Sequence, residues 1–243
     1  MDEYAKIASL LEEGRISPQE AEKLLAALDG PSPERKTAAA GGSLRVQIDR
    51  VDLRVGVDPA LGEPKVEAPD SLRLSLQKRE NGWELKQQGS KLRIGLFDLF
   101  SKRHAARLLL PAGVGLDVRL GQGALSVHDP LPALRASVGQ GSVDFAAAEE
   151  LDVQLAQGSI SGRARLAGGS HRLSLGMGSV KLVLEKGSDL RLQLKTGMGE
   201  ILVTGAVQHA SKKPSARYEG SVGEGRGMLK VSVGMGSVEV EVL

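Results

Sequence analysis

The side chains best suited to catalysis or metal binding in this sequence are its histidines, because the chain contains no cysteine. They occupy four isolated positions, His104, His128, His171 and His209. No His-Glu-x-x-His motif links them, and Asp117, Asp144 and Asp152 do not share a position within the repeats described below. His171 falls among apolar strand residues, where we expect a hydrogen-bonded or partly solvated ring rather than a metal ligand. The sequence therefore predicts no catalytic residues, no metal site, no cofactor and no enzymatic activity.

A second pattern with chemical meaning is Gly-x-Gly, which binds phosphate when it opens a helix. The glycines concerned are Gly121, Gly123, Gly139, Gly141, Gly158, Gly176, Gly178, Gly197, Gly199, Gly234 and Gly236, with Ala156 in the first place of the third triplet. No helix is predicted after any of them and no Lys-Ser or Lys-Thr follows, so a phosphate loop is excluded. Glycine here allows a positive φ and a close approach of neighbouring segments. The triplets are predicted to be structural corners.

The residue between the two glycines is less easily explained by structure alone. It is glutamine in the first three triplets and methionine in the last three: Gln122, Gln140, Gln157, Met177, Met198 and Met235. Stacked repeats would align these side chains as a ridge, since glutamines can hydrogen-bond along a stack and methionine is an adaptable contact residue. We predict a contact surface for a protein partner, for self-assembly or for a membrane surface. The alternative is that each methionine folds back over its own corner.

The elements that must position this ridge are short strands. The first five triplets begin 18, 17, 20 and 21 residues apart, and apolar residues alternate around each of them, as at Leu116, Val118 and Leu120 before the first. Neither strand of such a repeat covers its own apolar face, so repeats must stack, about 4.8 Å apart. The predicted fold is mainly β: a single-stranded β-solenoid (β-helix) of repeats of about 20 residues. An antiparallel sandwich remains an alternative, whereas a membrane barrel lacks its aromatic girdles.

Outward positions support stacking of successive repeats. The first of them reads Asp117, Arg135, Asp152 and Arg172, followed by Gln193 and Lys230. Opposite charges on adjacent strands attract, so the alternating signs favour this register. The wide gap before the last triplet is interpreted as one degenerate repeat, from Tyr218 to Gly225. Residues 241–243 follow the final strand with no evident cap, which would leave an open end.

The chain divides into three parts: 1–29, a helical hairpin; 30–42, a flexible linker; and 43–243, the β-repeat domain, most regular over 116–243. A capping box at Ser17-Pro18-Gln19-Glu20 starts the second helix. The apolar faces of the two helices comprise Ile7, Leu10, Leu11, Leu24, Leu25 and Leu28. Two such short helices bury little area, so we expect a partner-docking or self-association module, with a docked cap as the alternative.

Composition narrows the class of partner. With 32 basic and 30 acidic residues, the chain lacks the charge expected for nucleic-acid binding. No apolar run has the length of a membrane span, and the acidic N-terminus lacks the features of a signal peptide. We expect a cytoplasmic location and leave open a peripheral position at the inner face of the membrane. A homo-oligomer or a protein partner, held through the hairpin or a solenoid end, is the expected assembly.

Two stretches resemble known families. The phrase from Leu10 to Leu25, LLEEGRISPQEAEKLL, closely resembles the SHOCT-like helical hairpin of bacterial proteins. Residues 43–243, with apolar-x-apolar strands and Gly-Ser or Gly-Glu corners, resemble the "putative-adhesin" β-strand repeat family, a domain of unknown function. Together they are similar to the LiaX/YvlB type of cell-envelope stress protein. The resemblance implies a β-solenoid without known catalytic activity, associated with envelope stress or the response to antimicrobial peptides, and it transfers no functional residue.

The sequence thus predicts a non-catalytic scaffold or binding module of the bacterial cell envelope or its stress response, acting through protein or membrane-surface contacts. The alternative is a self-assembling β-solenoid polymer similar in principle to bactofilin filaments. A carbohydrate-active β-helix enzyme is a distant third.

Overall fold

The computed structural model describes residues 7, 10, 13, 15, 16 and 20 and the ranges 42–88, 104–146, 148–207 and 216–243. Its strands belong to one thirteen-stranded sheet, so the fold is mainly β, as predicted. They are β1 (Ser43–Arg50), β2 (Asp52–Val57), β3 (Lys65–Glu67), β4 (Leu74–Arg79), β5 (Gly82–Gln87), β6 (Ala105–Leu110), β7 (Gly115–Val127), β8 (Leu131–Phe145), β9 (Ala148–Ala164), β10 (Ser170–Leu184), β11 (Leu190–Gly205), β12 (Arg217–Val222) and β13 (Gly227–Val242). A single turn of 3-10 helix, η1 (Asp70–Leu72), precedes β4.

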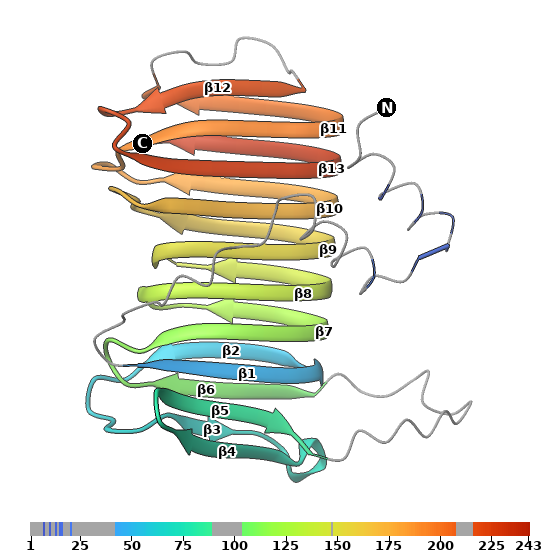
Figure 1. Cartoon of the computed structure of the whole chain (residues 1–243), viewed down its shortest axis with the longest axis vertical. Coiled ribbons are helices and arrows are strands. Elements are labelled where there is room, and N and C mark those ends of the chain that lie inside the picture. Colours follow the sequence, from blue (N-terminus) through green and yellow to red (C-terminus); the bar gives the residue numbers. More distant parts are fainter. Residues whose placement is uncertain are drawn as a thin grey trace.

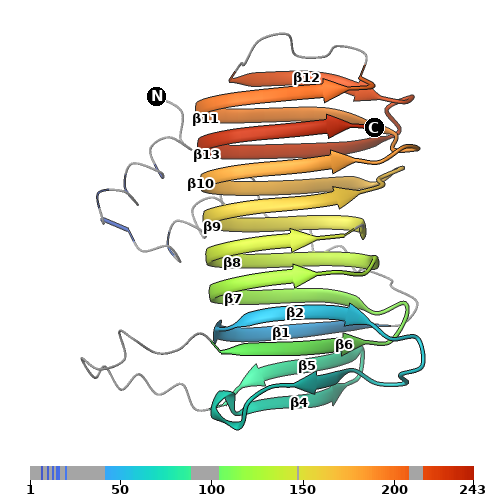
Figure 2. The same ribbon diagram turned by 180° about the vertical axis from the view of Figure 1, so that it is seen from behind.

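Each long strand, from β7 to β11 and β13, folds back on itself at its glycine corner (Figures 1 and 2). Its first half lies in one layer of the stack, which we call the first layer, and its second half lies in the other, the second layer. In β7, Leu116 and Val118 before the corner and Leu125 and Val127 after it are all buried in one core. The predicted alternation is therefore confirmed, with both halves contributing their apolar sides to the space between the layers. We call one strand folded in this way a rung.

The rungs pair in parallel and corner lies on corner. Gly141 of β8 is in register with Gly123 of β7, and Gly158 of β9 with Gly141. The second glycine of every corner has a φ between +133° and +141°, a region that other residues avoid. A β-carbon at Gly158 would also overlap the carbonyl oxygen of Gly141. These corners thus require glycine for backbone reasons, as predicted.

The order of the rungs differs from the expected order in the chain. Rungs β7, β8, β9 and β10 stack successively, but the next position is occupied by β13, and β11 lies beyond it. Leu173 of β10 pairs with Val231 of β13, which pairs in turn with Leu194 of β11. The expectation that successive repeats stack in chain order is wrong at this end. All three strands carry the same apolar spacing. The pattern therefore specifies the register of pairing but does not determine which strand pairs with which.

The interpretation of Tyr218 to Gly225 as a degenerate repeat is also wrong. This segment supplies β12, a short strand antiparallel to the first half of β11, with Leu194 opposite Tyr218. It has no second half. A turn at 223–226 then carries the chain past the start of β11, where β13 begins. Strands β12 and β13 therefore lie on either side of β11, and β12 closes the first layer.

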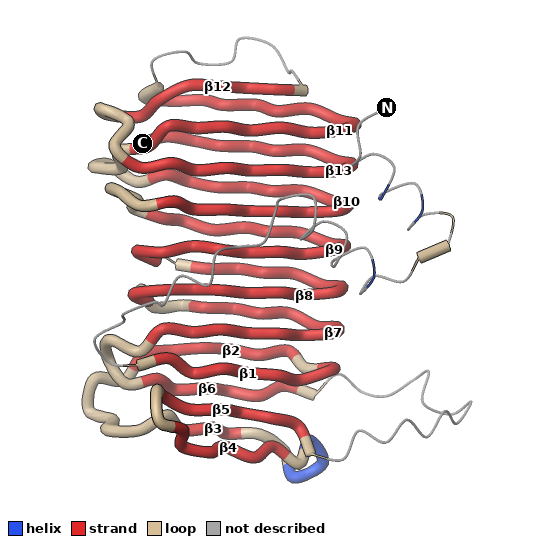
Figure 3. The backbone as a smooth tube through the Cα atoms, in the orientation of Figure 1, coloured by secondary structure: helices blue, strands red, loops and turns tan. Residues whose placement is uncertain are grey.

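The other end of the stack is also closed by antiparallel strands. Strands β1 and β2 together take the place of one rung against β7, with β5 beyond β1 and β6 beyond β2. The hairpin β4–β5 and the antiparallel pair β3–β6 complete this end (Figure 3). Because β13 is internal, the expected open end after the last repeat is wrong: the last strand has a parallel neighbour on both sides.

The predicted N-terminal hairpin falls mostly outside the described residues. Ile7, Leu10 and Glu20 are helical, and Ile7 is buried. The backbone amides of Arg15 and Ile16 donate to the carbonyl of Leu10. The remaining residues of its two apolar faces, Leu11, Leu24, Leu25 and Leu28, and the linker up to residue 41 lie outside, so that part stays a prediction.

Candidate functional site

The six residues between the corner glycines form one continuous column along an edge of the stack, which we call the corner ridge. In spatial order they are Gln122, Gln140, Gln157, Met177, Met235 and Met198. The predicted ladder of glutamines continuing into methionines is therefore present in the structure. Its last two members are exchanged relative to the chain, because β13 precedes β11 in the stack.

The glutamine part of the ridge is hydrogen-bonded along the stack. The Gln122 amide donates to Oε1 of Gln140 over 3.0 Å, and the Gln140 amide donates to Oε1 of Gln157 over 3.2 Å. Each bond uses only one of the two amide N–H groups of its donor. The remaining polar capacity of these partly exposed side chains is open to solvent or to a partner.

The methionine part is apolar and becomes more exposed toward β11. Met177 and Met235 are half-buried, whereas Met198 is 47% exposed. Met198 is thus uncovered, unlike in the alternative in which each methionine folds over its own corner. The ridge combines a polar segment and an apolar segment on one narrow edge, flanked by glycines and, before Gln157, by the small residue Ala156.

A second column beside the ridge was missed by the sequence analysis. The residue after each second glycine is serine in four consecutive rungs, and these serines are in register: Ser142, Ser159, Ser179 and Ser237. The signal was available, because four of the six triplets are followed by serine. The hydroxyls widen the ridge into a strip with hydrogen-bonding groups on one side.

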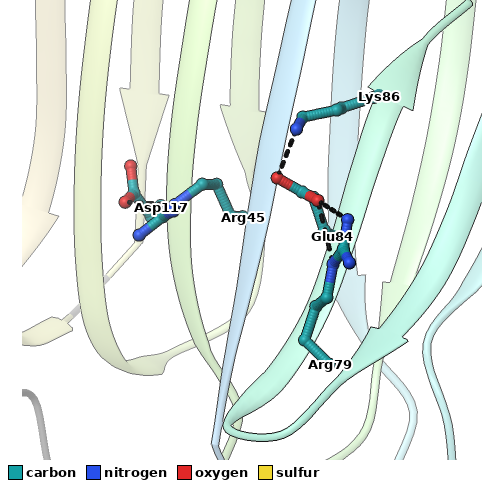
Figure 4. Close-up of polar contacts among 5 residues, drawn as sticks. All are labelled: Arg45, Arg79, Glu84, Lys86 and Asp117. Atoms are coloured by element: carbon teal, nitrogen blue, oxygen red, sulfur yellow. Dashed lines mark hydrogen bonds and ion pairs between the residues drawn. The ribbon is translucent and has the colours of Figure 1, made fainter.

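The outer side of the first layer carries the predicted alternation of charge. Its column begins with Glu84 of β5, followed by Arg45 of β1 and Asp117 of β7 (Figure 4). Arg45 Nε lies 3.5 Å from the Asp117 carboxylate. Lys86 and Arg79 approach the Glu84 carboxylate at 2.7 and 2.6 Å, and these two cations hold its pKa below the usual value.

The column then continues upward with the predicted signs. Arg135, Asp152 and Arg172 follow in register, so opposite charges face each other on every adjacent pair of strands as far as β10. The alternation ends at β13, where Lys230 lies beside Arg172. Insertion of β13 therefore places two like charges on neighbouring strands.

The histidines are not brought together. His171 is fully buried, and its Nε2 donates to the carbonyl of Gly168 over 2.6 Å, so the ring is hydrogen-bonded but not solvated. Its Nδ1 has no hydrogen-bond partner in the described part of the chain. Burial lowers the pKa of His171, which keeps the ring neutral. His104 lies 3.4 Å from the hydroxyl of Ser71, His128 is exposed, and His209 lies outside the described residues.

An ion pair between the buried carboxylate of Asp189 and the exposed side chain of Arg226 lies where β13 enters the stack. The Asp189 carboxylate accepts from the backbone amide of Arg226 at 3.1 Å and from its guanidinium. These hydrogen bonds hold the pKa of Asp189 below its usual value. Because Asp189 precedes β11 and Arg226 precedes β13, the pair clasps two strands that are neighbours only in space. Its position between these two strands indicates a structural role.

No group of three or more histidines or carboxylates within 42–88, 104–146, 148–207 and 216–243 could hold a metal ion. No helix among the described residues is long and apolar enough to cross a bilayer.

Comparison with known proteins matches the two parts of the chain separately. Residues 2–32 match the family model of a SHOCT-like domain, in agreement with the resemblance noted for the hairpin. No curated protein matches the sequence. A crystal structure described as a "putative cell adhesion protein" from Clostridium sporogenes ATCC 15579 is similar over 83% of this chain and 92% of that chain, with a TM-score of 0.54 and 15% identity. At that identity the likeness concerns the fold.

A second solved structure, described as a "putative adhesin" from Bacteroides fragilis NCTC 9343, covers 82% of this chain and 91% of that chain. Its TM-score is 0.27 at 9% identity, so no argument rests on it.

Proposed function

We propose that the chain is a non-catalytic scaffold or binding module built on a β-solenoid. In-register parallel rungs, each folded at a glycine corner around one shared core, support the solenoid interpretation. Such a stack offers long, regular edges and faces to a partner. The proposed mode of action is protein–protein or membrane-surface contact along these surfaces.

The proposed setting is the bacterial cell envelope and its stress response. The SHOCT-like match at residues 2–32 supports this setting, together with the resemblance of the combined parts to LiaX/YvlB-type proteins. The similar fold of a protein described as a "putative cell adhesion protein" agrees with a binding role. We propose a position at the inner face of the membrane, with the hairpin as a further docking module.

The observation that carries the proposal is the corner ridge. A column of three hydrogen-bonded glutamines leads into three methionines, of which Met198 is 47% exposed. Core packing does not require these side chains, since none of the six belongs to the buried apolar core. Methionine adapts to irregular surfaces, so the apolar segment is the proposed point of contact.

The test is photo-crosslinking in bacterial cells challenged with a membrane-active antimicrobial peptide. A photoreactive residue at position 235 should give a defined adduct, identified by mass spectrometry, whereas one at position 119 on the first-layer face should not. With the probe moved to position 179 beside the ridge, replacing Met177, Met198 and Met235 together with glutamine should reduce the adduct at least fivefold. The melting temperature of this variant should stay within a few degrees of that of the unmodified chain. Equal crosslinking at positions 235 and 119, or none at 235, would contradict the proposal.

The alternative function is a self-assembling polymer of the bactofilin kind. One observation favours it. Strand β12 pairs only with Leu190–Lys195 of β11, and no described strand pairs with the hydrogen-bonding edge of Glu200–Gly205 that faces away from β13. An uncovered strand edge is a template for another chain. Size exclusion and negative-stain microscopy with and without residues 1–30 would test it, because a concentration-independent monomer is incompatible with a polymer.

A further inference from the structure

The outer side of the first layer is basic over its last four strands. In β10, β13, β11 and β12 the outward side chains include five basic residues and one acidic residue, Glu219. The basic residues are Arg172, Lys230, Arg191, Lys195 and Arg217. Arg191, Lys230 and Arg217 are exposed. We call this surface the basic face.

The outer side of the second layer is acidic at the same height. Glu239 and Glu241 of β13 and Glu200 of β11 are exposed there. Lys181 of β10 also lies on this surface, 3.3 Å from Glu239, and neutralises one of the three carboxylates. We call this surface the acidic face. Leu202, which is 37% exposed, lies beside Glu239 and gives the face an apolar centre.

The two faces point in opposite directions, because the inward side chains of both layers meet in the core between them (Figures 1 and 2). They therefore cannot neutralise each other within one molecule. The lower rungs differ, since Arg45 lies opposite Asp117 and Arg135 opposite Asp152 on one side of the stack. In the rungs from β1 to β9, neighbouring charges of the first layer alternate in sign, whereas the strands from β10 to β12 carry mostly basic residues on one face and mostly acidic residues on the other.

We propose that the basic face of one copy docks on the acidic face of a second copy. The second copy is favoured as occupant because it carries complementary charge on the same strands, with the same spacing of about 4.8 Å between rungs on both surfaces. The contact is heterologous: each copy that uses its basic face still presents its acidic face. Association is therefore side by side and does not need a free end of the stack.

The size of the faces indicates a weak contact. The acidic face is the smaller one, with three strands, because β12 has no second half. Three strands about 4.8 Å apart and about six residues long, at 3.3 Å per residue, give an area of roughly 300 Å² per copy. Twice that area, about 600 Å², is below the roughly 1,000 Å² expected of a stable specific interface, so the contact is a transient one. We expect association that depends on concentration, and that salt screens, because the Debye length falls from about 30 Å at 0.01 M to about 8 Å at 0.15 M.

The experiment is sedimentation velocity of the full chain over a hundredfold range of concentration, at low and at physiological salt. The variant Arg191→Glu with Lys230→Glu leaves three basic and three acidic residues on the basic face and so removes its net positive charge, and the variant Glu200→Lys with Glu241→Lys makes both faces basic. Each alone should weaken self-association at least tenfold. An equimolar mixture of the two should associate again, because the first variant keeps the acidic face and the second variant keeps the basic face. The control variant Arg54→Glu with Arg119→Glu changes two exposed charges on the lower rungs and should behave as the unmodified chain.

Specific outcomes would overturn the proposal. One is a wild-type monomer at all concentrations at low salt; another is a failure of the mixed variants to associate. Binding to anionic phospholipid vesicles that Arg191→Glu with Lys230→Glu abolishes, without self-association of the unmodified chain, would assign the basic face to a membrane instead. None of these variants touches the corner ridge, so the result is independent of the proposed contact function.

Discussion

The rungs from β7 to β10 and the rungs β10, β13 and β11 are built from the same repeat but assembled differently. In the first region each rung pairs with the next one in the chain. In the second, β10 and β11 are separated by β13, which arrives later in the chain. The lengths of the connections do not predict this order of rungs. Residues 165–169 join two neighbouring rungs, whereas residues 185–189, an equally long connection, join two rungs that have a third between them. The repeat pattern therefore determines register, and the pairing partner is decided elsewhere.

The inserted strand gives the second region a different energetic character. Rungs β7 to β10 pair across about one repeat of sequence, whereas Leu173 of β10 pairs with Val231 of β13. Closing a longer loop costs more chain entropy, and contacts between distant residues form later in folding. We expect the region from β10 to β12 to be completed last and to open first, with Asp189 and Arg226 holding β13 in place.

The largest expected effect comes from the corner glycines. Gly236→Ala in β13 and Gly141→Ala in β8 each force a β-carbon onto a carbonyl oxygen of the neighbouring rung at a φ near +140°. Each should lower the free energy of unfolding by about 3 kcal/mol. Hydrogen exchange should show that Gly236→Ala removes protection from β11, β12 and β13 while β7 to β9 keep theirs, and that Gly141→Ala exposes β7 to β9. An identical exchange pattern in the two variants would show that the regions do not open separately.

The second effect concerns acid stability and the buried ring of His171, which lies against β13 opposite Leu229. Its folded-state pKa is lowered by burial, a shift that the Gly168 hydrogen bond and attraction by Glu150 partly offset. As the pH falls, His171 is therefore protonated in the unfolded chain before it is protonated in the folded chain. Stability contributed by the neutral ring is present above about pH 6.5 and is lost as the pH falls below it.

His171→Leu should remove this loss of stability, because leucine has no titratable group. The site should accept leucine, since the neighbouring inward position in β13 is already leucine. Urea unfolding at pH 7.5 and pH 5.5 should show a smaller difference between the two pH values in His171→Leu than in the unmodified chain. The control is His128→Gln, which changes an exposed histidine and should leave the difference intact. If His171→Leu keeps the full pH dependence, another group is responsible for it.

The smallest effect reverses its sign between the two regions. Lys230→Glu replaces the like-charge neighbour of Arg172 with an opposite charge and should stabilise the chain by up to about 0.5 kcal/mol. Asp117→Lys, between Arg45 and Arg135, should destabilise it by up to about 1 kcal/mol. Thermal unfolding at low salt measures both, and both effects should shrink in 0.5 M salt. The same sign for both substitutions would show that the column of charges contributes nothing to register.

Much of the candidate site could be predicted because it depends on local spacing. The positions of Gln122, Gln140 and Gln157 relative to their glycines place them on one edge in any in-register stack, and the structure has them hydrogen-bonded there. The order of Met235 and Met198 could not be predicted, since their local sequences, Gly-Met-Gly, are the same. The serine column was equally local and could have been found.

The sequence by itself determined the mainly β fold, the glycine corners, the two-sided alternation and the charges that face one another from β7 to β10. All of these follow from side-chain period and backbone sterics within a few residues. Only the tertiary structure decided that β13 lies between β10 and β11, that both ends of the stack carry antiparallel strands, and that charge separates between opposite faces. The physical reason is that repeats of equal pattern are interchangeable locally. The choice among them comes from long-range closure of the chain and from single contacts such as that of Asp189 with Arg226.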